Sequence, residues 1–355
     1  MYSLISVFLL EGIYFYNFTS PEFNVNVCQL PFWALVVYYS WKSINYEKTS
    51  DLMLLGIFMS IGFLTKYLFI YLIFTVKIIF LLQLIKKNKF NIKLLIPGTI
   101  FVLLLTPHLI WLYQNDFVTI AYAFNRTGIE EFSFINHFYN PFLFLVKQAG
   151  ILIPVFIMLL TFIKIKRINF NNLKKDNYFL LLINILPIIL MFLTSFISGA
   201  KIRTMWMTPF YLFLGVLLIQ IFKEYLNRNN FKKFLVAFVV FFILSPASYL
   251  FVSLSNDFKR TDYPGKEISD LVQRRWDKNF TNNISIVVGD EWYAGNLSYH
   301  LNSRPVWFNT IEKDLSLVTS DTGVIYVGNP NILKKFCPGI YGTIKPIGIC
   351  MIGAR

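Results

Sequence analysis

Long apolar runs, separated by short polar links, fill the chain from its first residues to about residue 255. A helix needs about 20 mostly apolar residues to cross a bilayer, and runs near that length recur throughout this part. We predict nine hydrophobic segments, over residues 3–18, 28–44, 52–64, 67–85, 94–113, 139–163, 178–198, 204–222 and 234–254. After residue 255, charged residues and Gly/Pro turns return at a density typical of water-soluble domains.

The apolar stretch 51–85 tests this segmentation. As one helix it would be about 52 Å long, whereas the hydrocarbon core of a bilayer is about 30 Å thick. It would also carry the basic link 86–93 to the wrong side of the membrane. We therefore predict two short helices with a break at Thr65 and Lys66, which places Lys66 near the outer face.

The last hundred residues alternate between helical and extended patterns. Apolar side chains recur at helical spacing over residues 264–276, and residues 291–302 also have a helical pattern. Short apolar strands are predicted over residues 284–289 and 323–328. The expected fold is an all-α polytopic membrane domain over residues 1–255, followed by a small α/β domain over residues 256–355.

The distribution of charge gives the orientation of the membrane domain. The chain is 56% hydrophobic and 15% charged, whereas soluble domains carry about 25% charged residues. Fifteen Lys and Arg residues lie in the links 42–50, 86–93, 164–175 and 223–233, and four lie in the other short links. The positive-inside rule places the basic links in the cytoplasm and the C-terminal domain outside it. Because the net charge of +14 is largely explained in this way, it does not indicate nucleic-acid binding.

The three cysteines do not form a framework. Cys28 lies near a membrane segment, and Cys337 and Cys350 flank a Gly/Pro-rich stretch of the tail. An extracytoplasmic tail would allow a disulfide between the latter two, and two unpaired thiols are an equal alternative.

Polar residues gather at the predicted outer face, while nucleotide loops, zinc spacings and nucleophile elbows are absent from the sequence. The candidates are Glu22, Asn24, Asn26, Lys66, Tyr67, His108, Asp116, Arg126, Lys201 and Arg203. Each also has a structural interpretation, as a turn residue, a snorkelling cation, a helix anchor or a hydrogen-bonded histidine. Together, the cations gather on the face that the topology rule leaves poor in positive charge, where they suit an anionic phosphate headgroup.

Four strings at these positions carry a family resemblance: FNVNVCQLPFWAL (residues 23–35), LLGIFMSIGFLTKY (54–67), TPHLIWLYQNDF (106–117) and RTMWMTPFY (203–211). They resemble the membrane core of GT-C glycosyltransferases of family 39, of the protein O-mannosyltransferase and aminoarabinose-transferase type. The tail strings YPGKEISDLVQRRW (263–276) and VVGDEWYAGNLSYHLNSRPVWF (287–308) resemble the C-terminal region of bacterial members.

The resemblance implies a multi-pass enzyme of the bacterial inner membrane. Such an enzyme transfers a sugar from a polyprenyl-phosphate donor to a lipid, glycan or protein acceptor at the outer face. Lys66 matches the family lysine that follows the broken helix, so the resemblance assigns it to the donor phosphate. Substrate-binding roles are expected for Tyr67, Asn24, Asn26, His108, Lys201 and Arg203, although Asn26 stands where relatives often carry Asp. Many relatives also need a divalent metal ion, for which this sequence offers no assigned ligand.

The general base is the weakest point of the resemblance. In the family, an acidic residue of an early outer loop accepts the proton of the acceptor hydroxyl. The chain is expected to lack the first spans of its relatives, and that residue with them. Glu22 and Asp116 are the nearest outer-face carboxylates and are weak substitutes.

Two alternatives to an active transferase remain open. A membrane transporter or lipid flippase would also be polytopic, but such proteins favour paired repeats with discontinuous helices at the midplane. A catalytically inactive relative would retain the membrane fold without the base.

Overall fold

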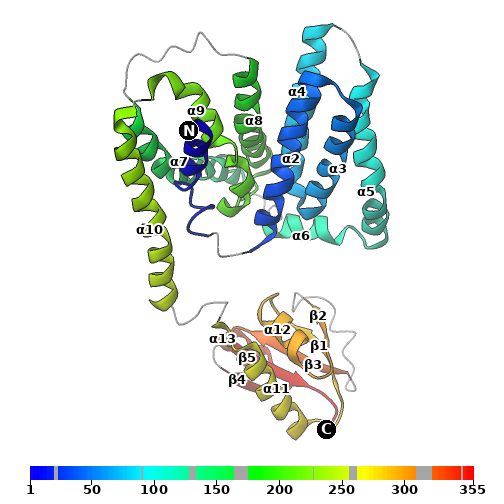
Figure 1. The fold of residues 1–355 in the computed structure, drawn as a ribbon. Helices are drawn as coiled ribbons and strands as arrows, with labels where there is room; N and C mark the ends of the chain where they lie inside the picture. The colour runs from blue at the N-terminus through cyan, green and yellow to red at the C-terminus, as the bar shows by residue number, and fades with distance from the viewer. Residues whose placement is uncertain are drawn as a thin grey trace. The chain divides into compact units, whose positions relative to one another are not determined.

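The computed structural model describes residues 1–19, 23–88, 91–127, 133–163, 175–226, 228–255, 262–308, 322–344 and 347–355. It divides into two compact units, Met1–Val252 and Ser253–Arg355. The first unit is helical and the second combines helices with a sheet (Figure 1). This confirms the predicted fold class, a helical membrane domain followed by a small α/β domain.

Unit 1 contains helix in each of the nine predicted hydrophobic segments. Its elements are α1 (Tyr2–Leu10), α2 (Val25–Tyr46), α3 (Thr49–Thr65), η1 (Tyr67–Phe69), α4 (Ile70–Lys87), η2 (Ile92–Leu95), α5 (Ile96–Gln114), α6 (Val118–Thr127), α7 (Asn136–Phe162), α8 (Lys175–Ser198), η3 (Thr204–Tyr211), α9 (Leu214–Phe222), η4 (Lys223–Tyr225), η5 (Arg228–Asn230) and α10 (Phe231–Ser255). Among the described residues, five helices are long and apolar enough to cross a membrane, or six if the bent pair η3 and α9 counts as one span.

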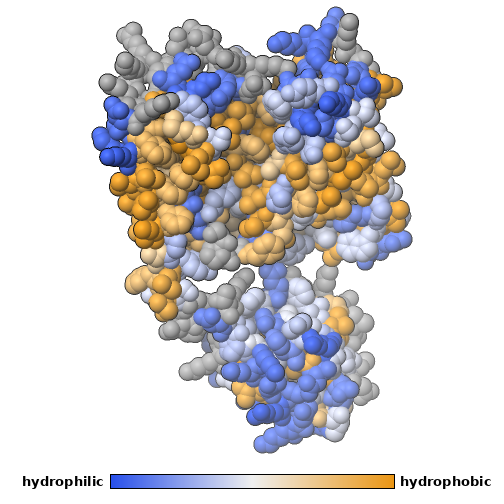
Figure 2. Space-filling view, in the orientation of Figure 1, coloured by the Kyte–Doolittle hydropathy of each residue, from blue (hydrophilic) through white to orange (hydrophobic). Residues whose placement is uncertain are grey.

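The surface of unit 1 is apolar around its middle. On the face shown in Figure 2, hydrophobic residues (orange) form a band across the middle of the helices, and hydrophilic residues gather toward the ends. Many large apolar side chains on α5, α7 and α10 are exposed in the isolated chain, for example Leu103, Phe142 and Phe242. Such a band is stable only where lipid covers it, because a soluble protein rarely leaves so large an apolar area in water.

Aromatic packing around Trp33 holds the centre of unit 1 together. Trp33 of α2 is 1% exposed, and its ring centroid lies 5.5 Å from that of Phe69 in η1 and 4.9 Å from that of Phe210 in η3. Aromatic pairs at these separations add to the burial of apolar area. Three segments that are far apart in sequence are thereby fixed beside one another.

The predicted break between residues 64 and 67 is confirmed. Helix α3 ends at Thr65, Lys66 has extended backbone angles, and η1 begins at Tyr67. The Thr65 hydroxyl donates to the Gly62 carbonyl over 2.6 Å and so satisfies one of the last carbonyls of α3.

The expectation of helix throughout residues 3–18 is wrong. Helix α1 ends at Leu10, and turns follow as far as Thr19. The Asn17 amide donates to the Glu11 carbonyl over 3.2 Å and to the Phe241 carbonyl of α10 over 3.1 Å. These side-chain hydrogen bonds replace helical ones. The helix can therefore end within an apolar run while the backbone carbonyls of Glu11 and Phe241 keep hydrogen-bond partners.

The segment 204–222 also differs from the expected single helix. It forms the 3₁₀ segment η3 followed by α9, with a bend of 51° between them. Pro209 lies inside η3, and proline has no backbone N–H to continue an α-helical ladder. A further helix, α6, lies in the link 114–138, where no helix was predicted.

The described residues of unit 2 form a five-stranded sheet with helices on both faces. Its helices are α11 (Gly265–Asn279), α12 (Tyr293–His300) and α13 (Pro330–Phe336), and its strands are β1 (Ile284–Val288), β2 (Val306–Phe308), β3 (Gly323–Gly328), β4 (Ile340–Ile344) and β5 (Ile347–Ile352). The strand order is β2-β1-β3-β5-β4. Strand β1 pairs in parallel with β2 and β3, whereas β5 pairs antiparallel with β3 and β4.

Alternation along the strands separates the two cores of unit 2. Ile325 and Val327 of β3 pack with α11 and α12, whereas Val324 and Tyr326 pack with Leu333 of α13. The predicted strands at 284–289 and 323–328 and the predicted helices are confirmed, with α12 slightly shorter than the expected 291–302.

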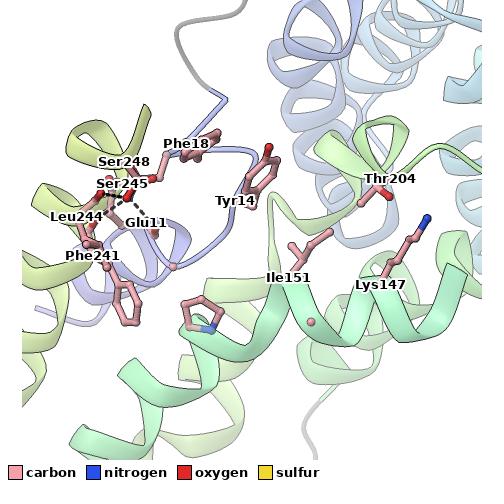
Figure 3. A pocket seen from close by; sticks show the side chains of 14 residues that line it. Glu11, Tyr14, Phe18, Lys147, Ile151, Thr204, Phe241, Leu244, Ser245 and Ser248 are labelled. Atoms are coloured by element: carbon pink, nitrogen blue, oxygen red, sulfur yellow. Dashed lines mark hydrogen bonds between the residues drawn. The ribbon is translucent and has the colours of Figure 1, made fainter. Parts of the chain in front are cut away.

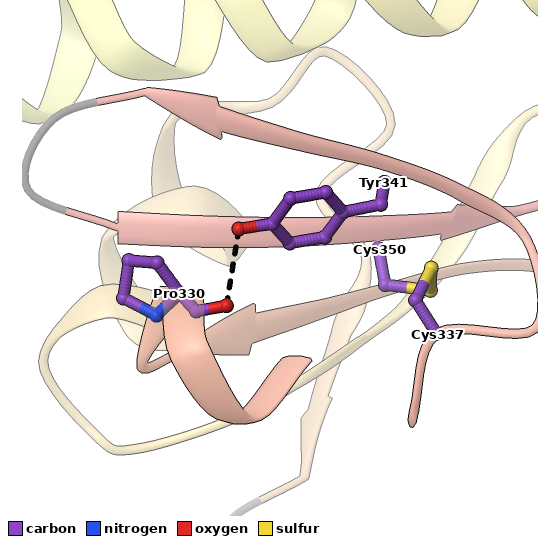
Figure 4. Close-up of a disulfide and its surroundings, with 4 residues drawn as sticks. All are labelled: Pro330, Cys337, Tyr341 and Cys350. Atoms are coloured by element: carbon purple, nitrogen blue, oxygen red, sulfur yellow. Dashed lines mark hydrogen bonds between the residues drawn. A yellow bond between two sulfur atoms is a disulfide. The ribbon is translucent and has the colours of Figure 1, made fainter. Parts of the chain in front are cut away.

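Cys337 and Cys350 are joined in a disulfide that ties the end of α13 to β5 (Figure 4). The Tyr341 hydroxyl donates to the Pro330 carbonyl over 3.0 Å on the same face. The structure therefore selects the disulfide from the two alternatives that the sequence leaves open.

Replacing both Cys337 and Cys350 by serine is expected to lower the free energy of unfolding of unit 2. The bridge closes a loop across 13 positions of sequence, and a loop of that length stabilises by about 3 kcal/mol through the unfolded chain. Urea-dependent proteolysis of unit 2 in the full chain measures the change. Cys28→Ser is the control, and an unchanged midpoint in the double variant would contradict the expectation.

Candidate functional site

A cavity of about 560 Å³ lies at the end of unit 1 where α2 begins and α6 ends. We call it the cation pocket, because four cationic side chains line it together with two amides. The polar lining comprises Asn24, Asn26, Arg126, Lys147, Lys201, Arg203, Thr19, Thr204 and Thr208. Among the described residues, no carboxylate lines this pocket. The electrostatic potential in the pocket is therefore positive and suited to an anion.

The N-terminus of α2 supplies the two amides. The Asn24 side chain caps the helix by accepting from the backbone N–H of Asn26 over 2.9 Å. Asn26 is 4% exposed, and its Oδ1 accepts from the Lys66 ammonium over 2.5 Å. The cap fixes the first turn of α2, so that Asn26 connects the wall of the pocket to Lys66.

Lys66 lies behind this wall rather than in it. Its ammonium is 5.2 Å from the ring centroid of Trp206 and bonds to Asn26, which lines the pocket. Lys66 lies between α3 and the span Tyr67–Lys87, and burial lowers its pKa to about 7. The side chain can therefore change its charge near neutral pH in response to an anion nearby.

Hydrogen bonds from three helices hold the loop that carries Lys201 and Arg203. The backbone N–H of Lys201 donates to the Thr127 carbonyl at the end of α6 over 3.0 Å. Asn140 of α7 donates to the Gly199 carbonyl over 2.7 Å, and Ser195 of α8 donates to the Ala200 carbonyl over 2.7 Å. Both predicted cations are thus placed on a fixed loop, beside Arg126 of α6 in the pocket.

Two predicted site residues form a separate cluster. The Tyr67 hydroxyl lies 2.7 Å from Nε2 of His108 and 2.8 Å from the Thr119 hydroxyl, within hydrogen-bonding distance of both. The His108 ring stacks on Trp111, with centroids 5.8 Å apart. These bonds connect η1, α5 and α6, and neither Tyr67 nor His108 lines the cation pocket. Their substrate-binding role stays a prediction.

The two weak candidates for the base do not enter the pocket. Asp116 is exposed in the turn between α5 and α6, with φ of 49°, and lines neither of the two cavities at this end. Glu22 lies outside the described residues. The described residues also hold no group of three or more His, Cys, Asp and Glu side chains that could ligate a metal, so no step is assigned to one.

The sequence reasoning missed two charged residues that the structure brings to the site. Lys147 interrupts the apolar run of α7 and lines the cation pocket. Glu11 interrupts the first apolar run and lines an adjacent cavity of about 710 Å³, which we call the side cavity (Figure 3). Both could have been found in the sequence, because each is a single charged residue within an apolar run. A charge within a membrane segment indicates a functional site.

A helical membrane unit followed by a small α/β unit is consistent with a GT-C-like membrane domain followed by a small α/β domain. Residues 1–111 match the model of the dolichyl-phosphate-mannose-protein mannosyltransferase family. The predicted resemblance is therefore confirmed over this part of the chain, and the match supports a membrane glycosyltransferase of the mannosyltransferase type. Comparison with curated proteins and with solved structures finds no match.

Proposed function

We propose that this protein transfers a sugar from a polyprenyl-phosphate donor to a hydroxyl group at the outer face of the bacterial inner membrane. The observation that carries the proposal is the cation pocket, which is lined by Arg126, Lys147, Lys201 and Arg203. Guanidinium and ammonium groups bind phosphate oxygens through short, charge-assisted hydrogen bonds. The family match over residues 1–111 supports the same reaction class.

In the proposed reaction, the acceptor oxygen attacks the anomeric carbon while the bond from that carbon to the phosphate oxygen breaks. Negative charge accumulates on the departing polyprenyl phosphate. Cations already in place at that oxygen stabilise the transition state more than the ground state, which is the condition for catalysis. Arg203 and Lys201 are suited to this role because their loop is held by bonds from α6, α7 and α8.

The location of unit 2 outside the cytoplasm is part of the proposal. The disulfide between Cys337 and Cys350 supports it, because such bonds persist in oxidising compartments and are rare in the cytosol. The basic links of unit 1 support the same orientation.

The proposal is tested with the purified full chain in nanodiscs. Polyprenyl-phosphate mannose is supplied as the donor, with hydroxyl-bearing acceptors of several classes, and transferred sugar is measured by mass spectrometry. Sugar transfer supports the proposal. Accumulation of the donor in proteoliposomes without transfer would instead favour a transporter or flippase, and donor binding without any turnover would favour an inactive relative.

Donor affinity is expected to decrease as the pH rises above about 7. Below the lowered pKa of Lys66, about 7, the ammonium behind the pocket wall is already charged and attracts the donor phosphate without taking up a proton. Above it, binding must first protonate the lysine, so affinity falls by up to about tenfold per pH unit. Titration of donor binding between pH 6 and 9 measures the slope.

Lys66→Arg is the control for this pH dependence. Because arginine remains charged throughout this range, the slope should vanish while affinity at low pH is retained. A wild-type affinity that does not change between pH 6 and 9 would mean that the charge of Lys66 does not act on the donor phosphate.

A further inference from the structure

The side cavity is larger than the cation pocket and is not used by the reaction as described so far. Its volume is about 710 Å³, within the range of about 300–1,000 Å³ typical of ligand sites. Its walls come from the turn after α1, from α7 and from α10, and most of the lining is apolar, including Tyr14, Phe18, Ile151 and Phe241. A ligand of this cavity would therefore be largely apolar.

Glu11 places a carboxyl group in this apolar surrounding. It follows the last residue of α1 and is half-buried. The Asn17 amide holds the turn in place by donating to the Glu11 backbone carbonyl over 3.2 Å and to the Phe241 carbonyl of α10 over 3.1 Å. Charged groups are costly among membrane helices, and they indicate a functional role when they face a cavity.

The side cavity and the cation pocket adjoin each other, because Tyr14, Lys147 and Thr204 line both. Figure 3 shows Glu11 near α10 on one side of the side cavity, with Lys147 and Thr204 on the other side. A displacement at an anomeric carbon needs the attacking oxygen and the leaving phosphate on opposite faces of the sugar. Glu11 and Lys147 line the same cavity at opposite sides, so a sugar held between the two cavities would have a carboxylate on one side and cations on the other.

We propose that Glu11 is the catalytic proton acceptor, and that the acceptor hydroxyl belongs to an amphiphilic lipid whose apolar part occupies the side cavity. The inference rests on the proposed glycosyl transfer. The hydroxyl oxygen forms a bond to the anomeric carbon as the bond from that carbon to the phosphate oxygen breaks. The hydroxyl proton moves to the Glu11 carboxylate, and the electron pair of the broken bond leaves with the polyprenyl phosphate.

The walls of the side cavity argue for a lipid acceptor. The most apolar 18-residue stretch of α10 has no residue buried within the chain. Phe241 and Leu244 of this helix line the cavity. An acceptor entering sideways from the bilayer would keep its apolar part in contact with such walls. A soluble peptide or glycan would have to place polar groups against them, which costs free energy for each group left without a hydrogen bond.

Glu11→Gln is expected to lower kcat for transfer from polyprenyl-phosphate mannose by about 10²- to 10⁴-fold, the range contributed by a positioned proton acceptor. Glutamine keeps the size and polarity of the side chain, so donor affinity should stay at the wild-type value. Glu224→Gln, at an exposed glutamate of η4, is the control and should retain the wild-type kcat. A wild-type kcat in Glu11→Gln would overturn the assignment, while sugar transfer by the wild-type protein would leave the proposed function standing.

Ser245→Trp tests the cavity itself, because Ser245 lines it on α10. A bulky ring there should raise KM for a hydroxylated glycolipid in the nanodisc at least tenfold and leave donor affinity unchanged. The wild-type protein should not glycosylate a soluble serine-containing peptide. Equal kcat/KM for the peptide and the glycolipid would overturn the lipid assignment, and absence of transfer to every acceptor would overturn this inference together with the proposed function.

Discussion

Replacing Arg203 by glutamine is expected to weaken binding of the polyprenyl-phosphate donor by about 10- to 100-fold, because a hydrogen bond to a charged group contributes about 1.5–3 kcal/mol. Arg203 is half-buried and lines the cation pocket. Its loop is already held in place in the isolated protein. Little reorganisation is therefore needed before it meets the phosphate, and most of the interaction is lost when the guanidinium is removed.

Donor binding in nanodiscs at fixed ionic strength measures the effect of Arg203→Gln. Lys233→Gln is a matched control. Lys233 is exposed at the start of α10, so this substitution removes one positive charge at a position outside the pocket lining. Equal affinities in the two variants would mean that the phosphate does not bind beside Arg203. A salt dependence that is weaker in Arg203→Gln than in the control would support a direct contact.

Replacing Trp276 by alanine is expected to lower the free energy of unfolding of unit 2 by about 3–5 kcal/mol, the usual cost of removing a large buried aromatic side chain. Trp276 is 1% exposed. Its indole N–H donates to the Asn282 carbonyl over 2.6 Å, and its ring centroid lies 4.5 Å from that of Phe280. Since whole domains are stable by only about 5–15 kcal/mol, this one substitution removes a large part of the margin.

Urea-dependent proteolysis of unit 2 in the full chain measures the Trp276→Ala effect. Tyr299→Ala is the control, because Tyr299 is an aromatic residue of the same unit that is 66% exposed, and a change there should stay within about 0.5 kcal/mol. If both variants unfold at the wild-type urea concentration, the core around Trp276 does not determine the stability of unit 2.

The sequence predicted the membrane helices well where hydrophobicity alone decides the structure. Apolar runs on α5, α8 and α10 form helices because every backbone group must be bonded within the segment in lipid. The prediction failed where specific side chains act on the backbone. Asn17 supports turns inside an apolar run, and Pro209 lies within the 3₁₀ segment η3. Hydrophobic segmentation cannot detect either effect.

The candidate site was predictable in part. Asn24, Asn26, Lys201 and Arg203 line one pocket although they come from distant segments, because orientation by charge places their links at the same end of the bundle. Tyr67 and His108 share that end but bond to each other instead. Which residues at this end of the helix bundle lie beside one another depends on helix packing, and the sequence does not show the packing directly. Lys147 and Glu11 were missed for a related reason. The sequence shows how far along a hydrophobic segment a residue lies, but not which cavity or neighbouring helix its side chain contacts.

The bond from Lys201 to Thr127 couples two parts of the pocket wall. Arg126 immediately precedes Thr127, whose carbonyl accepts this hydrogen bond at the end of α6, and the backbone N–H of Lys201 donates it. The two cations are therefore connected through one hydrogen bond. An incoming headgroup that displaces α6 must either break this bond or carry the 199–203 loop along. As long as this bond is intact, a movement of α6 therefore shifts Lys201 and Arg203 at the same time, so the positions of three cations in the pocket wall depend on one another.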